Sequence, residues 1–520
     1  MCIRDRIKTQ TELFCEFLDL LKVANSKALC ALVKSLSSHY CGSVVSLSLS
    51  EEFGRHYTMI NKVVKSLSVR GVAEDDAKHY ANVRKKVQHF ISPWLPSIRT
   101  AGGISYYGLS LDATSGGGEH AKCRKNRGFV YSPNNQVPGN KPVKVGNTLS
   151  VLHLNVVEQG VRWAPPLDVR CVDLDNSTTA VGVTQIKDLL LDKTLPFHAA
   201  LSVLKMDNQY CNAFCIAPLY ELVGLVNIIR ARHGQKVYFP TVEQTPGTSA
   251  PKPQGAKVVY GKEVFLKDVS ENKVFKKTIA GRTESYTKYQ ESIVDTPADE
   301  QTEQHLTLGN GRQVICLVKR WNNCKIRTKH GFSMKDKPLD VVRISVIDAQ
   351  SKKTIYNRPT FLFVTGQQKT QIPLDIIAPE YRERYDVEPT YRFSKQHLLL
   401  DKFQTPDEAH LDNWLLVWQL AFWLLFVARK EAALVVNPWE QYLPNYKNKL
   451  NKQDRVLTPA QTKRGMKTLF ATLGIPRREV QKCEKIKGAP KGRQFEKRPT
   501  YSPSKKGKKD PIEQKKQLNC

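Results

Sequence analysis

The segment YRERYDVEPTYRFSK groups side chains that suit work on a phosphate. Tyr381, Arg384, Glu388 and Lys395 fall at offsets 0, +3, +7 and +14, which is one face of a helix. That face carries a phenol, two cations and a carboxylate, which a hydrophobic core does not need. Pro389 should interrupt a continuous helix, but the first turn of a helix accommodates it. We therefore expect two helical pieces, one with Tyr381 and Arg384 and one beginning near Pro389, with Glu388 at their junction.

Two aspartates are expected where apolar strands end. ISYYGLSLD ends at Asp112 and LSVLKMD ends at Asp207, 95 residues later, and Glu388 follows after a further 181. A strand end presents a side chain into a crevice, although turns also favour Asp for their own reasons. Three carboxylates brought together would repel one another unless a cation lay among them. Oxygen ligands suit Mg²⁺ or Mn²⁺, and two such ions can support phosphoryl transfer.

These residues resemble the catalytic motifs of DDE transposases of bacterial insertion sequences, which have an RNase H-like fold. The chain is most similar to the branch with the signature Y-x2-R-x3-E-x6-K around the last acid, and the four residues named first stand at that spacing. LSLDATS at the first acid and KMDNQYCNAFCIAPL followed by LVNIIRAR at the second agree with it. The similarity extends from about residue 100 to 435.

The resemblance implies a role for each acid. It assigns the catalytic and metal-binding positions, with two Mg²⁺ or Mn²⁺ ions, to three residues that we call the acidic triad: Asp112, Asp207 and Glu388. A water would cut DNA at a transposon end, and the 3′-hydroxyl would then attack target DNA.

The resemblance also implies that Tyr381, Arg384 and Lys395 hold DNA phosphates, which suits the fork of Arg and the point charge of Lys. Some relatives form a hairpin intermediate with an aromatic residue from a β-rich insertion. Trp321 is a candidate for this base-stacking role, and a structural Trp is the alternative.

The composition favours a polyanionic partner. Lys and Arg number 80 against 49 acids, a net charge of +31. From Gln441 to Cys520 there are 22 Lys or Arg and 6 acids, a net +16. Nucleic acid is therefore the expected partner, ahead of an anionic membrane surface, and the resemblance implies double-stranded DNA. We expect a homodimer assembled on DNA and a cytoplasmic, nucleoid-associated protein.

The chain divides into five predicted regions around an α/β fold, an RNase H-like mixed sheet flanked by helices. They are an N-terminal helical DNA-binding domain at 1–95, a first part of the catalytic core at 100–240, a β-rich insertion at 241–350, a second part of the core at 351–440, and a basic disordered tail at 441–520. In the first region, a turn near Gly54 between two helices predicts a helix-turn-helix, and a plain helical bundle is the alternative.

Strand and helix predictions fill in the core. GFVYS and NTLSVLHLNVV are expected to be strands, LVNIIRAR a strand, and TTAVGVTQIKDLLLDKTL and NAFCIAPLYELVG helices. WLLVWQLAFWLLFVA, Trp414 to Ala428, is too short for a typical membrane span and predicts a buried core helix.

Two further features concern the cysteines and the start of the chain. The twelve cysteines contain no C-x-x-C pair, and no His pair stands at a spacing that would complete a zinc site with them. We therefore expect reduced, mostly buried thiols. The first six residues, MCIRDR, resemble a leader that adapter sequence contributes to translated fragments, so we expect the natural N-terminus to be missing.

Three functions remain open from the sequence. The first is a transposase, the second a catalytically inactive transposase-derived DNA-binding protein, and the third an RNase H-like nuclease without strand transfer.

Overall fold

The structure is a computed structural model of the whole chain. It describes residues 25–67, 83–131, 143–173, 176–241, 259–279, 282–307, 311–328, 331–356, 358–434, 455–472 and 498–503, together with the single positions 5, 12, 442 and 479.

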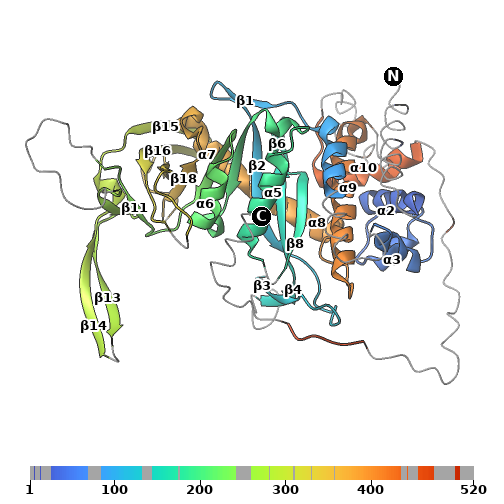
Figure 1. The fold of residues 1–520 in the computed structure, drawn as a ribbon. Helices are drawn as coiled ribbons and strands as arrows, with labels where there is room; N and C mark the ends of the chain where they lie inside the picture. Colours follow the sequence, from blue (N-terminus) through green and yellow to red (C-terminus); the bar gives the residue numbers. More distant parts are fainter. Residues whose placement is uncertain are drawn as a thin grey trace, which may run out of the picture.

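A mixed sheet of ten strands crosses the molecule (Figure 1). Its order is β15-β16-β17-β18-β10-β9-β2-β5-β8, with β1 paired to β2. The pairs β2–β9 and β9–β10 are parallel and the others are antiparallel. The strands are β1 Arg99–Ala101, β2 Ile104–Ser115, β5 Thr148–Leu154, β8 Pro166–Val172, β9 Leu201–Met206, β10 Leu225–Arg230, β15 Glu300–Thr307, β16 Gln313–Cys324, β17 Leu339–Asp348 and β18 Thr360–Thr365.

Helices cover both faces of this sheet. α5 and α6 pack on one side, against β5, β8 and β10. On the other side α7 closes a second apolar cluster over β10, β16, β17 and β18. The eight helices of the described residues are α2 Ser26–Ser38, α3 Thr58–Lys65, α5 Thr178–Leu190, α6 Ala213–Tyr220, α7 Leu374–Glu383, α8 Val387–His397, α9 Glu408–Leu434 and α10 Pro459–Thr472.

The central strands are continuous apolar runs because neighbours on both sides and helices on both faces bury them. In β9, every residue from Ser202 to Met206 is buried. The sequence therefore predicts β9, β10, α5 and α6 correctly, since each combines an apolar run or helical spacing with a turn at its end. The α/β class is confirmed, and the described residues form a mixed sheet as expected.

The strand predicted at GFVYS is confirmed but lies outside the main sheet, and one strand of that sheet was missed. β3, Gly128–Tyr131, is a strand as GFVYS predicts, but it pairs with β4, Val143–Gly146, in a separate hairpin. The sheet position beside β5 belongs to β8, which the sequence analysis missed. Two prolines precede its Val and Cys residues, and these prolines hide the strand signal, although Pro is tolerated at the first residue of a strand.

The helix α9 is the buried core helix that its composition predicts. It is long and apolar enough to cross a membrane, but 94% of its most apolar window is buried inside the protein. Two of its polar side chains bond to β8: the Gln419 amide donates to the carbonyls of Pro166 and Leu167, and Trp423 Nε1 donates to the Pro166 carbonyl.

The N-terminal helices share a core with the C-terminal part of the chain. α2 and α3 pack against α9, and α2 also contacts α10. Asn413 of α9 donates to the Val64 carbonyl over 2.8 Å. The segment before α3 is a five-residue 3-10 helix, Val45–Leu49, and the chain turns between it and α3 at residues 50–57. The DNA-binding role of this region stays a prediction.

The prediction of a disordered tail was wrong for α10. Its Met466, Leu469 and Phe470 are buried, and the buried Lys463 ammonium donates to the carbonyls of Leu36 and His397. Basic composition suggested disorder, but the apolar residues of this segment recur at helical spacing and bury against α9. Most of the remaining tail lies outside the described residues.

The cysteines follow the prediction with one exception. Seven described cysteines are free. Cys211, Cys215, Cys316 and Cys324 are buried, and Cys41, Cys123 and Cys171 are partly exposed. Cys30 is disulfide-bonded, so the expectation of reduced thiols was wrong for this residue.

The predicted β-rich insertion is β-rich, but most of it continues the main sheet. β15, β16 and β17 join the sheet through β18. β11, Lys236–Tyr238, pairs with β12, Glu263–Phe265. β13, Glu271–Ile279, and β14, Arg282–Gln290, form a long hairpin that projects from the end of the molecule (Figure 1).

Candidate functional site

The parallel pair β2–β9 brings the two predicted aspartates together. Leu111 of β2 is in register with Met206, the last residue of β9. Asp112 and Asp207 are the next residues along the two segments, so they are neighbours at the carboxyl end of β9. β2 continues to Ser115, paired on its other side with β5. Asp112 therefore lies within the strand and not at its end, at the point where the β9 neighbour stops.

The segment around the last acid folds as two helices with a tight turn between them. α7 ends at Glu383, a 3-10 turn covers Arg384–Asp386, and α8 begins at Val387. Tyr381 lies in α7, Glu388 in the first turn of α8, and Lys395 in its last turn. Pro389 lies in the first turn of α8, where no backbone N–H is required. The predicted break in the helix is confirmed.

Arg384 is the cation nearest to the first acid. Its Nη1 lies 4.0 Å from Asp112 Oδ1, and its side chain is only 7% exposed. The guanidinium carbon lies 4.5 Å from the ring centre of Tyr385 and 5.8 Å from that of Tyr381. Burial alone would lower the pKa of Arg384, but Tyr381, Asp207 and Asp112 raise it above its ordinary value. Arg384 is therefore a fixed positive charge beside both aspartates.

Asp112 responds to both other members of the triad. Burial raises its pKa to about 6; Arg384 and the Ala113 N–H oppose the rise, whereas Asp207 and Glu388 add to it. The repulsion means that the three carboxylates lie within electrostatic range of one another. The structure thus brings the triad to one region, from β2, β9 and α8.

Several buried polar atoms near the triad, Arg384 Nε included, lack a hydrogen-bond partner in the described part of the chain. Among the oxygen atoms are Asp207 Oδ1 and the Tyr381 hydroxyl. Burial raises the pKa of Tyr381, with Arg384 opposing the rise and Asp207 adding to it. Buried polar atoms are normally paired, so these two indicate a group that binds here.

The donor set suits a divalent cation, but the ligands are not assembled. Carboxylate oxygens are the ligands that Mg²⁺ and Mn²⁺ prefer, and Asp207 has an oxygen to offer. Among the residues that the structure describes, no three Asp, Glu, His or Cys side chains are close enough to hold a metal ion. Glu388 is solvent-exposed, and the nearest positive charge to Asp112 is a guanidinium. The metal site stays a prediction.

Lys395 lies on the side of Asp112 that faces the end of β2. Its ammonium donates to Ser115 Oγ over 3.1 Å. Burial and the nearby Lys144 lower the pKa of Lys395 to about 8, while Asp401 and Asp112 oppose the change. A half-buried ammonium held by a neutral hydroxyl can receive an anion.

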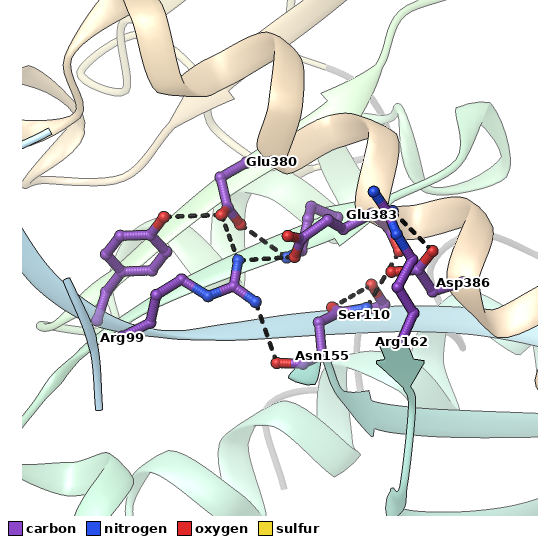
Figure 2. Close-up of polar contacts among 9 residues, drawn as sticks. Arg99, Ser110, Asn155, Arg162, Glu380, Glu383 and Asp386 are labelled. Carbon is purple, nitrogen blue, oxygen red and sulfur yellow. Dashed lines mark hydrogen bonds and ion pairs between the residues drawn. The ribbon is translucent and has the colours of Figure 1, made fainter. Parts of the chain in front are cut away.

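An ion-pair network that the sequence analysis missed anchors α7 to the strands (Figure 2). Glu380 accepts from Arg99 over 2.5 Å, from the Tyr106 hydroxyl over 2.7 Å and from Lys205 over 2.8 Å. Lys205 is fully buried, two residues before Asp207. Burial alone would raise the pKa of Glu380, but Lys205 and Arg99 lower it well below its usual range.

The network continues into the turn after α7. Glu383 binds Arg99 over 2.7 Å, and Asn155 donates to the Glu383 carbonyl over 3.1 Å. Arg162 donates to Asp386 over 3.0 Å (Figure 2). Each of these contacts joins residues far apart in sequence, so only an acid-rich run next to Tyr381 and a lone Lys in an apolar strand could have signalled them.

Tyr391 is a second residue that the sequence analysis missed. It lies in α8, and its hydroxyl donates to the backbone carbonyl of Asp112 over 3.3 Å. This bond ties the helix that carries Glu388 and Lys395 to the strand that carries Asp112.

The Trp321 side chain is buried and is not available to stack on a base. Its side chain is 1% exposed in β16, and its Nε1 donates to the Thr296 carbonyl over 3.0 Å. A fully buried indole with a satisfied N–H is a structural residue, so the structure favours the alternative interpretation over base stacking.

Comparison of the chain with protein-family models and with curated proteins finds no match.

Proposed function

We propose that the protein is a DNA transposase of the DDE type with an RNase H-like core, which cleaves DNA at transposon ends and joins the 3′-hydroxyl to target DNA. The observation that carries the proposal is the juxtaposition of Asp112 and Asp207 by the β2–β9 register, with Glu388 close enough to raise the pKa of Asp112. The interruption of the helix at Arg384–Asp386, just before Pro389, and the mixed sheet flanked by helices support it.

Each residue would have a defined task. The acidic triad would bind Mg²⁺ or Mn²⁺, which, when bound, supplies Lewis-acid activation of the attacking oxygen and charge stabilisation at the leaving oxygen. Arg384 would turn from Asp112 toward a phosphate, since its fork binds phosphate oxygens in two places. Lys395 would add a point charge at the other end of α8, and the unpaired Tyr381 hydroxyl would donate to a phosphate oxygen.

The direct test uses purified protein, labelled DNA from the ends of the element and Mg²⁺. We expect nicking at the end, lost in Asp112→Asn, Asp207→Asn and Glu388→Gln, with DNA binding retained. A control is Glu303→Gln, because Glu303 is an exposed acid on β15, away from the triad. Undiminished cleavage by Glu388→Gln would remove this residue from the triad.

A second function has a specific observation in its favour. The triad side chains are not assembled as metal ligands in the described residues, which also suits a catalytically inactive DNA-binding derivative of a transposase. Binding of end DNA without any nicking in Mg²⁺ or Mn²⁺ would establish that alternative. Nicking without joining of the 3′-end to target DNA would instead indicate a nuclease on the same fold.

A further inference from the structure

The hairpin β13–β14 is a two-stranded ribbon that leaves the body of the protein. Its register runs without interruption from Glu271 opposite Gln290 to Ile279 opposite Arg282. In the described part of the chain the two strands form a sheet of their own and pair with no other strand. Figure 1 shows the ribbon extending away from the main sheet. At about 3.3 Å per residue, nine residues give it a length of roughly 30 Å.

The ribbon exposes apolar and aromatic side chains that no part of the described protein covers. Val274 is 60% exposed, Tyr286 50% and Tyr289 58%. Phe275 and Tyr286 lie opposite each other and stack, with ring centres 5.5 Å apart. A lone hairpin is marginally stable in water, and its unpaired edges invite association. These features indicate that the ribbon binds a partner.

The positive charge of the ribbon indicates which class of partner it binds. The sequence of the hairpin contains five Lys or Arg and two Glu, a net charge of +3 on a chain of net +31. Lys273 lies directly opposite Lys288, and like charges opposite each other weaken a strand pair. Lys288 binds Glu263 over 2.7 Å, whereas Lys273, whose ammonium lies 5.8 Å from the Phe275 ring centre, has no ion-pair partner among the described residues. A second copy of the ribbon would bring the same positive charge, whereas a polyanion would relieve it.

We propose that the β13–β14 ribbon enters the major groove of duplex DNA, with the face that carries Lys273, Phe275, Tyr286 and Lys288 toward the bases. Two strands about 4.8 Å apart fit a groove about 12 Å wide, and two-stranded ribbons are known to occupy it. Lys273 contacts a phosphate at the groove wall, and the Phe275–Tyr286 pair packs on base edges such as thymine methyl groups. The inference rests on the proposed function only in taking duplex DNA as the partner.

The opposite face of the ribbon supplies a matched control. Side chains alternate between faces along a strand, so Tyr289 and Val274 lie on the face away from Tyr286. Tyr286→Ala and Tyr289→Ala therefore remove the same group from the same strand, at similar exposure, on opposite faces. For Lys273→Gln the control is Lys262→Gln, because Lys262 is an exposed lysine outside the ribbon, 57% exposed.

The experiment measures binding of the full chain to a mixed-sequence duplex of about four helical turns, with a metal chelator present and at several KCl concentrations. We expect Tyr286→Ala to weaken binding roughly three- to tenfold, and Tyr289→Ala to leave it unchanged. Lys273→Gln should reduce the log–log salt slope by ~0.9, the value for one phosphate, and Lys262→Gln should not. Wild type should protect guanine N7 from methylation in the major groove, and Tyr286→Ala should lose that protection.

Two results would overturn the inference. One is an equal effect of the Tyr286 and Tyr289 variants on DNA affinity, or none from either. The other is a change of Tyr286→Ala from dimer to monomer in sedimentation with DNA affinity unaltered, since the ribbon would then bind a second copy. Because no cleavage is measured, a protein that uses the ribbon but never cuts DNA would sink the transposase proposal and leave the ribbon standing.

Discussion

The protein destabilises the ionised form of Asp112, which is the form that prevails at neutral pH. Its raised pKa means that the folded protein binds a proton more tightly than the unfolded chain between about pH 4 and pH 6. The free energy of unfolding should therefore fall as pH rises through that window and stay low at neutral pH, where the carboxylate is ionised beside Asp207 and Glu388.

We predict that Asp112→Asn stabilises the metal-free protein at pH 7.5 by about 1–3 kcal/mol while abolishing cleavage. The stabilisation should shrink at pH 4, where Asp112 is protonated in the wild type. Thermal unfolding at the two pH values measures both effects. If Asp112→Asn and the wild type had the same melting temperature at pH 7.5 as well as at pH 4, the carboxylates around Asp112 would not destabilise its ionised form.

A bound metal ion should offset the repulsion among the carboxylates of the acidic triad. We predict that millimolar Mg²⁺ raises the melting temperature of the wild type at pH 7.5, because a ligand that binds only the folded state stabilises it. Asp112→Asn and Asp207→Asn should lose this response, whereas the exposed Glu303→Gln should keep it. A response unchanged in all three variants would place the cation elsewhere.

Lys395 gives a pH test of the phosphate-binding role. With a pKa of about 8, its ammonium is partly deprotonated in free protein above that pH. We predict that affinity for DNA falls by up to about tenfold per pH unit above pH 8 as the charge is lost. Lys395→Arg should bind equally well at pH 9 and pH 7, because an arginine stays charged. If Lys395→Ala bound and cleaved DNA as the wild type does, the role would be wrong.

At the scale of elements, α7 depends on one buried carboxylate. Glu380 is 5% exposed and holds Lys205, which has no exposure at all, against the helix that precedes Arg384. Gly108 leaves room for this lysine: a Cβ there would lie 3.0 Å from its ammonium nitrogen. The buried ion pair between Glu380 and Lys205 thus anchors α7 to β9.

We predict that Glu380→Gln destabilises the protein by about 3 kcal/mol, because it removes the nearer of the two carboxylates that pair with the buried Lys205 and leaves only Glu383, 3.6 Å away. The pair replacement Glu380→Met with Lys205→Met should restore much of the stability, since an apolar pair needs no charge compensation. Urea unfolding of the three variants measures this. If the double variant were as unstable as Glu380→Gln, packing and not charge would explain the loss.

At the scale of the whole molecule, helices from the N-terminal and C-terminal parts of the described residues share one core. α2, α3, α9 and α10 bury one another, and a piece of the tail reaches the loop after β2, where Arg127 donates to the Tyr501 carbonyl over 2.7 Å. The basic segment therefore divides into a part that stabilises the fold and a part beyond residue 503 with a sequence net charge of +4.

We predict different effects for two truncations. Removal of residues 504–520 should leave the melting temperature unchanged and reduce the salt dependence of DNA binding, because phosphate contacts made by the tail are lost. Removal from residue 455 onward should also lower the melting temperature, because it uncovers the apolar face of α9 that α10 buries. Equal melting temperatures for the two truncated proteins would contradict the structural role of α10.

The sequence by itself determined the local features of this protein. Asp112 and Asp207 follow apolar runs, Pro389 lies in the first turn of a helix, and the Trp-rich helix is apolar on every side; each is a property of a few consecutive residues. Spacing also predicted that Tyr381, Arg384, Glu388 and Lys395 act together, although not that Arg384 would lie against Asp112.

Tertiary structure alone decided the remaining features. The neighbour of β5 is β8 and not β3, α10 is a core helix, Trp321 is buried, and Glu380 pairs with Lys205 across 175 residues. In each case burial or pairing depends on a surface contributed by a distant segment. Composition and periodicity describe one segment at a time, so they cannot identify which partner will cover it.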